Sequence, residues 1–227
     1  MYTAIIPAAG SGSRMNLGYN KLLHKIAGYT VIEHTVRHFL NDIMCRQIII
    51  TSSADDLEKI SGLFYREKRI EVVLGDVTRQ ESICQALEFV KHDIVLIHDG
   101  ARPFINKQII NDCADLAATG VGAITGVKIK DTIKKRHSSN NNMISQTLNR
   151  DQLIAVQTPQ AFPTDVLKKA YALAKNVSFL STATDDAMIV EKFTEIPVMI
   201  VEGDYKNLKF TTTEDLEYFE FLLRRRF

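Results

Sequence analysis

The chain begins with a short apolar run, Ala4 to Ile6, which leads directly into a loop of small residues, Pro7-Ala8-Ala9-Gly10-Ser11-Gly12-Ser13. An apolar run that ends in a glycine loop is typical of a buried strand that stops at the edge of a sheet. Because glycine has no Cβ, backbone N–H groups in such a loop can approach a phosphate closely. Arg14 and Lys21 follow and supply positive charge. This stretch therefore predicts an anion site behind the first strand of an α/β fold.

Two better-known phosphate loops do not fit this stretch. The dinucleotide-binding fingerprint requires a third glycine, and Met15 occupies that position here. The P-loop requires a lysine directly after its second glycine, and no part of the chain has that pattern. A redox dinucleotide site and P-loop chemistry are therefore disfavoured. The loop by itself leaves function open, because a tight strand-to-helix turn with a solvated arginine fits it equally well.

Composition narrows the class of partner. The 227 residues include 28 basic and 27 acidic ones, so no bulk field attracts nucleic acid or an anionic membrane. The three cysteines are far apart in sequence, which argues against disulfides and a zinc site and favours a reducing cytoplasm. No apolar run approaches the length of a membrane span, and no export signal is evident. We expect one cytoplasmic domain over residues 1–227, without a nucleic-acid or membrane partner.

Apolar runs alternate with amphipathic stretches along most of the chain. This alternation predicts an open, mostly parallel twisted sheet flanked by helices. Strands are expected at 4–6, 47–51, 70–74, 93–99, 121–127 and 196–201, and helices at 31–40, 53–66, 79–90, 105–118, 164–175 and 184–190, with a last helix after Thr211. The helix at 53–66 would be capped by Ser53 or Asp55. Ligands of such sheets bind beyond the carboxyl ends of the strands, where the loops at Pro7, Gly75 and Asp99 should meet.

The segment 128–157 departs from this alternation. Short apolar groups around Ile129–Ile133 and Met143–Leu148 enclose the polar tract Lys134 to Asn142. Two short strands around a polar turn predict a β-hairpin arm that projects from the domain. Because an isolated strand pair is marginally stable, we expect the arm to pack on a partner surface and to form a homodimer.

Six stretches of the chain stand in a characteristic order: Ala8 to Met15, Gly75 to Ser82, His98 to Pro103, Gln157 to Phe162, Thr184 to Ala187 and Asn207 to Thr211. Their order and spacing resemble the 2-C-methyl-D-erythritol 4-phosphate cytidylyltransferases of the non-mevalonate isoprenoid pathway. The resemblance implies a Rossmann-like nucleotidyltransferase fold and a homodimer built through the arm. It also implies CTP and a sugar-alcohol phosphate as substrates, with Mg²⁺ or another divalent cation as cofactor.

The resemblance assigns roles to individual residues. Arg14 and Lys21 match the catalytic pair, Asp99 matches a metal ligand, and Arg150 on the arm would serve the neighbouring subunit. The nucleotide-binding residues that it implies are Pro7, Ala8, Ala9, Gly10, Ser11, Gly12, Gly75, Asp76, Arg79, Ser82, Asp99, Gly100 and Ala101. The substrate-binding residues that it implies are Asp99, Arg102, Thr132, Arg150, Thr158 and Lys209, the last on a strand-like stretch at 207–211. Without the resemblance, Lys21, Arg150 and Lys209 could be surface charges and Asp99 a turn residue.

The sequence also departs from the family's usual pattern. Asn20-Lys21-Leu22 stands where Pro-Lys-Gln is usual, and Asn149 precedes Arg150 where aspartate is commoner. Asp76 replaces the second of two glycines, which puts a side chain near the expected base. Two other functions stay open: a cytidylyltransferase for ribitol 5-phosphate or another polyol phosphate, and a nucleotide-binding regulator without catalysis. The ribitol enzymes more often read His-Asp-Ser-Val-Arg-Pro at 98–103.

Overall fold

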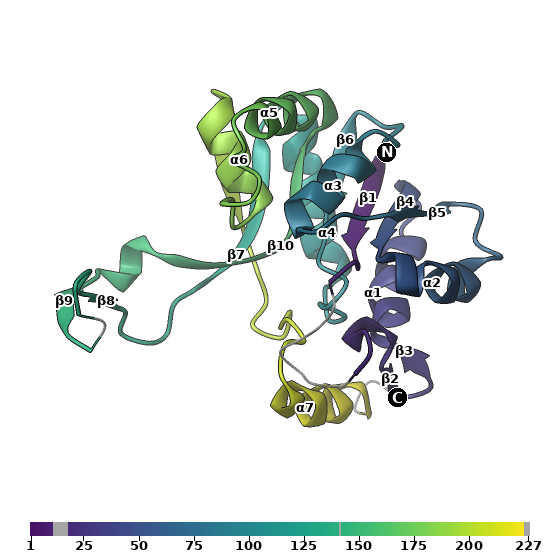
Figure 1. Ribbon diagram of the computed structural model, residues 1–227, viewed down its shortest axis with the longest axis horizontal. Helices are drawn as coiled ribbons and strands as arrows, with labels where there is room; N and C mark the ends of the chain where they lie inside the picture. The colour runs from purple at the N-terminus through teal and green to yellow at the C-terminus, as the bar shows by residue number, and fades with distance from the viewer. Residues whose placement is uncertain (11–17, 141, 225–227) are drawn as a thin grey trace.

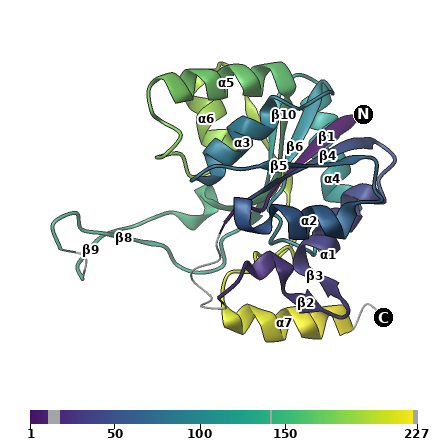
Figure 2. The ribbon, with the colours of Figure 1, turned by 45° about the vertical axis from the view of Figure 1, so that its right-hand side comes forward.

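The computed structural model describes residues 1–10, 18–140 and 142–224, and its centre is a seven-stranded sheet with helices on both faces (Figures 1 and 2). The strand order is β11-β7-β10-β6-β1-β4-β5. The strands are β1 (Tyr2–Pro7), β4 (Cys45–Ser52), β5 (Ile70–Leu74), β6 (Ile94–Ile97), β7 (Gly122–Lys128), β10 (Ile154–Pro163) and β11 (Val198–Glu202). Strand β10 runs antiparallel to its neighbours β6 and β7, whereas the other neighbouring pairs are parallel. The predicted mostly parallel sheet is confirmed.

The helices follow the predicted pattern, with shifted ends. They are α1 (Val31–Leu40), α2 (Leu57–Phe64), α3 (Arg79–Leu87), α4 (Lys107–Ala118), α5 (Thr164–Asn176), α6 (Asp186–Phe193) and α7 (Thr213–Arg224). Short 3₁₀ turns are η2 (Lys21–Leu23), η3 (Ala54–Asp56) and η4 (Arg150–Gln152), and β2 (Lys25–Ile26) pairs with β3 (Tyr29–Thr30). The expected helix start at Ser53 or Asp55 is wrong. The 3₁₀ turn η3 comes first, and the side chains of Ser53 and Asp56 make no cap bond.

The sheet separates two apolar cores, because neighbouring side chains of a strand point to opposite faces. In β1, Ala4 and Ile6 belong to the core beneath α1, α2, α4 and α7, while Ile5 belongs to the core beneath α3, α5 and α6. All three are 0% exposed. Both faces of the strand are therefore buried, which explains why its sequence is a continuous apolar run rather than an alternating one.

Helix α7 closes the first core below the sheet, beside β2 and β3 (Figures 1 and 2). Its Phe219 is fully buried. The Phe219 ring lies 4.8 Å from the Phe104 ring and 5.2 Å from the Phe210 ring, measured between centroids. The first pair is edge-to-face and the second is tilted, and aromatic pairs of this kind contribute about 0.5–1.5 kcal/mol beyond the burial of their area. The segment that contains Phe210 is thus fixed from below by the last helix.

A hairpin arm of β8 (Lys134–Arg136) and β9 (Ile144–Thr147) projects from the body (Figures 1 and 2). The expectation of a first arm strand at Ile129–Ile133 is wrong, because β8 lies in the tract expected to form the polar turn. The strand expected around Met143–Leu148 is confirmed as β9. The ends of the expected arm, Lys128 and Ile154–Gln157, belong to β7 and β10 of the main sheet.

The arm is polar apart from a few side chains. Both of its strands are exposed along their whole length, and Ile144 is 59% exposed.

Among the described residues, no helix combines the length and the apolar character that crossing a bilayer requires.

Candidate active site

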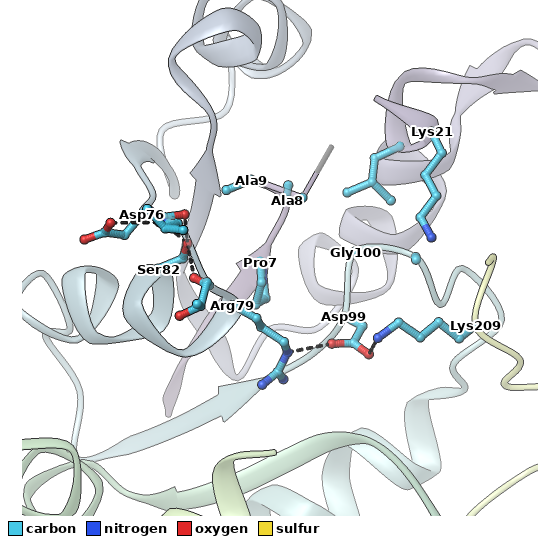
Figure 3. Close-up of a pocket in the computed structure, with 15 residues that line it drawn as sticks. Pro7, Ala8, Ala9, Lys21, Asp76, Arg79, Ser82, Asp99, Gly100 and Lys209 are labelled. Carbon is cyan, nitrogen blue, oxygen red and sulfur yellow. Dashed lines mark hydrogen bonds and ion pairs between the residues drawn. The ribbon is translucent and has the colours of Figure 1, made fainter. Parts of the chain in front are cut away.

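A pocket of about 320 Å³ lies at the edge of the sheet where β1, β5 and β6 end (Figure 3). Most of its lining comes from the three loops that follow these strands. The lining residues are Pro7, Ala8, Ala9, Gly10, Lys21, Leu22, Asp76, Val77, Thr78, Arg79, Ser82, Asp99, Gly100, Ala101 and Lys209. The predicted meeting of the three loops at the carboxyl edge of the sheet is therefore confirmed.

Asp99 follows β6 and forms ion pairs with basic side chains from separate segments. Its Oδ1 accepts a hydrogen bond from Arg79 Nε at 3.1 Å, and its Oδ2 lies 2.8 Å from Lys209 Nζ and 3.5 Å from Arg102 Nε. Figure 3 shows the carboxylate between Arg79 and Lys209. Burial alone raises the pKa of Asp99, but the neighbouring cations, Arg79 first, lower it well below the usual range. Asp99 is therefore ionised, and it ties these cations to one point.

The backbone of Asp99 is held by Thr158 of β10. The Asp99 N–H donates to Thr158 Oγ1 at 3.0 Å, and this hydroxyl lies 3.1 Å from His98 Nδ1. The Nε2 atom of His98 lies 3.0 Å from the carbonyl oxygen of Arg102, so Nε2 carries the hydrogen and Nδ1 accepts from Thr158. Burial lowers the pKa of His98 to about 3. The ring is thus neutral at physiological pH, as this pattern of bonds requires.

Lys209 reaches the pocket from an irregular segment, and the expectation of a strand-like stretch at 207–211 is wrong. Two backbone groups of this segment are tied to the loop after β6. The Phe210 N–H donates to a carbonyl of that loop at 2.8 Å, and the Asn207 carbonyl accepts from Arg102 Nη1 at 2.8 Å. These bonds place Lys209 beside Asp99 without a sheet ladder.

The side chain of Asn207 fastens the same segment to β10. It is fully buried, and its Nδ2 donates to the carbonyl of Thr158 at 2.9 Å and to Oε1 of Gln157 at 3.2 Å. Gln157 Nε2 in turn donates to the Asp204 carbonyl at 3.0 Å. Both the start and the middle of the segment that carries Lys209 are therefore attached to one strand.

Gly75 lets the loops after β1 and β5 pack together. A Cβ at this position would lie 2.8 Å from Ala9 Cβ and 2.8 Å from Ser82 Oγ, so a larger residue does not fit. The Ser82 hydroxyl accepts from the Asp76 N–H at 2.9 Å. Thr78 caps α3, whose first turn faces the pocket. The pocket wall is therefore built from backbone and a helix N-terminus, which together favour an anion.

Lys21 enters the pocket from η2, and Asn20 holds that turn. Asn20 Nδ2 donates to the Ala8 carbonyl at 3.0 Å, while its Oδ1 accepts from the Leu22 N–H at 3.0 Å. Figure 3 shows the Lys21 side chain extending into the pocket. The φ of Asn20 is −63°, a value that proline also adopts. The turn thus keeps a proline-like shape, and the asparagine adds a tie to the loop after β1.

Asp76 turns its carboxylate away from the pocket. Its Oδ1 accepts from the Val77 N–H at 2.7 Å, and the residue is exposed. In Figure 3 the carboxylate points away from Asp99 and Lys21. The side chain that replaces the expected glycine therefore faces solvent, and the pocket wall at this position consists largely of backbone.

Some expected site residues do not line this pocket. Ser11, Gly12 and Arg14 lie outside the described residues. Thr158 is buried and Arg102 is half-buried, and both hold Asp99 from behind. Thr132 and Arg150 lie on the arm, where Arg150 Nη1 donates to the carbonyl of Lys130 at 2.6 Å.

Sequence reasoning missed two of the residues that support Asp99 and Lys209. No role was predicted for His98 or Asn207, although both are fully buried. For His98 a signal existed: a polar residue directly after the wholly apolar strand Ile94–Ile97 ends in the interior. For Asn207 no such signal exists, because its partners lie on a strand about 50 residues earlier.

Asp99 was also expected to bind a divalent cation. The described residues contain no group of three or more His, Cys, Asp or Glu side chains that could hold a metal ion. Magnesium commonly takes one or two carboxylates and completes its shell with water and substrate phosphates. Asp99 fits such a cation as one hard oxygen ligand, with phosphates supplying most of the others.

Comparison with known proteins identifies the family. The family model described as IspD, 2-C-methyl-D-erythritol 4-phosphate cytidylyltransferase, matches residues 2–225. The chain belongs to the IspD family. IspD relatives named 2-C-methyl-D-erythritol 4-phosphate cytidylyltransferase include one from Bacillus velezensis, 40% identical over 227 residues and covering 98% of this chain and 96% of the relative. Another, from Bacillus cereus, is 40% identical over 228 residues, covering 99% and 98%.

Solved structures give the same family. The 4-diphosphocytidyl-2C-methyl-D-erythritol synthase of Anaerococcus prevotii is similar with a TM-score of 0.85 and 31% identity, covering 98% of this chain and 95% of that one. The Francisella tularensis IspD structure is similar with a TM-score of 0.81 and 30% identity, covering 96% and 98%. The Rossmann-like fold with a hairpin arm is therefore that of the IspD family.

Proposed function

We propose that the protein transfers the cytidylyl group of CTP to 2-C-methyl-D-erythritol 4-phosphate. A phosphate oxygen of the acceptor attacks the α-phosphorus of CTP and forms a new P–O bond. The bond from that phosphorus to the oxygen bridging to the β-phosphorus breaks, and pyrophosphate leaves with the electron pair. The product is the CDP-linked methylerythritol used for isoprenoid precursors. Family membership names this chemistry, and the cation cluster around Asp99 beside Lys21 is the structural observation that carries it.

The reaction brings two anionic phosphates together. The protein therefore contributes mainly by positioning them and neutralising their charge, rather than by forming a covalent intermediate. Lys209 is suited to the phosphate of the acceptor, because Asp99 keeps its ammonium at the pocket edge. Lys21 is suited to the α-phosphate of CTP, and Arg14 would complete that pair. Charge that builds up in the transition state then meets Lys21 and Lys209, which already line the pocket. Each such donor contributes about 3 kcal/mol to lowering the barrier.

The nucleotide would lie along the wall made by the loops after β1 and β5. Gly75 and Ser82 bring these loops into contact, so backbone groups rather than long side chains face the base. Gly100 and Ala101 continue the wall beside Asp99. When backbone groups enclose a small space for the base, a pyrimidine fits better than a purine.

We also propose that Mg²⁺ or another divalent cation takes part, held by Asp99 and the phosphates of CTP. When bound, the cation neutralises phosphate charge. Chelation with excess EDTA should abolish pyrophosphate release, and added Mg²⁺ should restore it. Full activity in EDTA would contradict this part of the proposal.

The chain is proposed to act as one domain that dimerises through the arm between β7 and β10. The exposed β8–β9 hairpin supports this, since two strands alone are marginally stable without a partner surface. Arg150 and Thr132 would then meet the partner's pocket rather than their own.

The test is an assay of purified protein with CTP and 2-C-methyl-D-erythritol 4-phosphate, following pyrophosphate release and the CDP-linked product. Parallel reactions replace the acceptor with ribitol 5-phosphate and CTP with ATP. We expect turnover with the first pair and far less with the others. Turnover of ribitol 5-phosphate alone, or binding of CTP without pyrophosphate release, would overturn the proposal.

A further inference from the structure

The Thr184 to Ala187 motif has no part in the proposed reaction as described so far. Its two acids have different partners. Asp185 caps α6 by accepting from an amide of the first turn at 3.0 Å, and it also accepts from Gln160 Nε2 at 2.9 Å. The Asp186 side chain instead points to Arg79 in the pocket wall. The first acid therefore has a structural role at the helix end, and the second has a connection to the site.

Asp186 is enclosed by one cation and one hydroxyl group. Its Oδ2 accepts from Arg79 Nη2 at 2.9 Å, and its Oδ1 accepts from Tyr171 Oη at 2.5 Å. Asp186 is 0% exposed and Tyr171 is 1% exposed. A buried carboxylate is costly unless it is paired and hydrogen-bonded, and here both of its oxygens have a partner. The pair is thus a fixed feature of the interior.

Arg79 connects this buried pair to the pocket. Its Nη2 faces Asp186, and its Nε donates to Asp99. Its third nitrogen, Nη1, is buried and has no acceptor in the part of the chain that the structure describes. Because a guanidinium group is planar and rigid, holding Nη2 on one carboxylate determines where Nε points. Asp186 therefore helps to orient the group that donates to Asp99.

The balance of charges agrees with this connection. Burial lowers the pKa of Arg79, but Asp186 and then Asp99 raise it well above the usual range. Burial and the charge of Asp186 also raise the pKa of Tyr171, so its hydroxyl keeps the proton that it donates. The guanidinium therefore stays charged between the two carboxylates.

We propose that Asp186, supported by Tyr171, is a positioning residue for the cytidylyl transfer. It holds Arg79 so that the guanidinium keeps Asp99, and through it Lys209, in place at the edge of the pocket. Asp186 does not itself line the pocket, so it acts through Arg79. This inference rests on the proposed function and gives Arg79 the role of holding Asp99 rather than the nucleotide.

The experiment compares Asp186→Asn with wild type. The amide has the same shape but no charge, and its NH₂ group cannot accept from Arg79 or Tyr171. We expect kcat to fall by about 100-fold, the effect of a displacement near 1 Å, with a much smaller change in the KM for CTP. A crystal structure of the variant should show an intact fold with Arg79 displaced from Asp99.

Asp185→Ala is the matched control at the neighbouring position. It removes the α6 cap, so it should lower Tm while leaving kcat unchanged. Tyr171→Phe removes one hydroxyl and should lower kcat severalfold, and it replaces Asp186→Asn in all measurements if that variant does not fold. A kcat equal to wild type, or an Arg79 still bound to Asp99 in the variant structure, would overturn the proposal. Wild-type protein without turnover would instead contradict the proposed function, and the variant structure would still test the connection.

Discussion

Asn20 joins two parts of the pocket through one side chain, since its amide group both caps the turn of Lys21 and holds the Ala8 carbonyl. Asn20→Ala should destabilise the protein by about 1 kcal/mol, the usual effect of a lost cap. It should also lower kcat by about tenfold or more, because Lys21 is no longer held in register with the loop after β1. Thermal unfolding and steady-state kinetics measure the two effects.

Asn20→Asp separates the two bonds. The carboxylate still accepts from the Leu22 N–H, but it cannot donate to the Ala8 carbonyl. If the tie to Ala8 matters for catalysis, this variant should keep most of its stability and lose activity. Activity equal to wild type would show that the cap is sufficient.

His98 makes stability depend on pH. Its pKa is about 3 in the folded state because of burial, and about 6.5 when unfolded. Between these values the unfolded chain binds more protons, so the contribution is fully present above pH 6.5 and is lost as the pH falls toward 3. The expected loss is about 1.4 kcal/mol per pH unit in the steep part. Denaturant unfolding at several pH values between 6.5 and 4.5 measures it.

His98→Gln cannot titrate, and it should show a shallower dependence of unfolding free energy on pH than wild type. Its absolute stability does not enter the comparison, since only the slope is measured. Equal slopes for wild type and His98→Gln would exclude His98 as the cause.

The irregular segment that carries Lys209 depends on the buried side chain of Asn207. Asn207→Ala leaves the Thr158 carbonyl and Gln157 without this donor, which should destabilise the protein by about 1–3 kcal/mol. The loosened segment should also raise the KM for the acceptor phosphate about tenfold, a change of ~1.4 kcal/mol. Lys206→Ala alters an exposed residue of the same segment and should change neither quantity. An unchanged KM in Asn207→Ala would contradict this view.

Strand β10 shows where sequence patterns fail at the scale of elements. Its centre, Gln157 to Gln160, is polar and contains Pro159, and such a stretch argues against a strand. The sheet accepts it because pairing with β7 shifts register between Val156 and Gln160. The polar residues released there hold Asp99 and Asn207. The polar residues that make this strand hard to recognise in the sequence therefore support the site.

The inner parallel strands β1, β4 and β6 were easier to predict, because their apolar runs are continuous and buried on both faces. Their common carboxyl edge then placed the loops at Pro7, Gly75 and Asp99 together. The partnership of Arg79 with Asp186 could not be predicted, because it joins residues 107 positions apart. Assigning Lys209 to the site needed the family resemblance, since its segment has no periodic pattern.

At the scale of the whole molecule, the arm predicts shared sites. Arg150→Ala and Lys209→Ala should each be nearly inactive as homodimers. After the two variants are mixed and re-equilibrated, half of the dimers are mixed, and each mixed dimer has one pocket with both residues intact. In a two-fold dimer this restores about a quarter of wild-type activity. No recovery, with exchange of subunits verified by mass, would place Arg150 in its own subunit's pocket or outside the site.

Because Phe219 packs on Phe210, the last helix influences how tightly the substrate binds. Phe210 follows Lys209 directly, so this ring contact helps to fix the position of the residue that we assign to the acceptor phosphate. A shortened or loosened α7 would therefore weaken substrate capture before it unfolds the sheet. Substitutions in this distant helix would therefore change the affinity for substrate before they reduce the amount of folded protein.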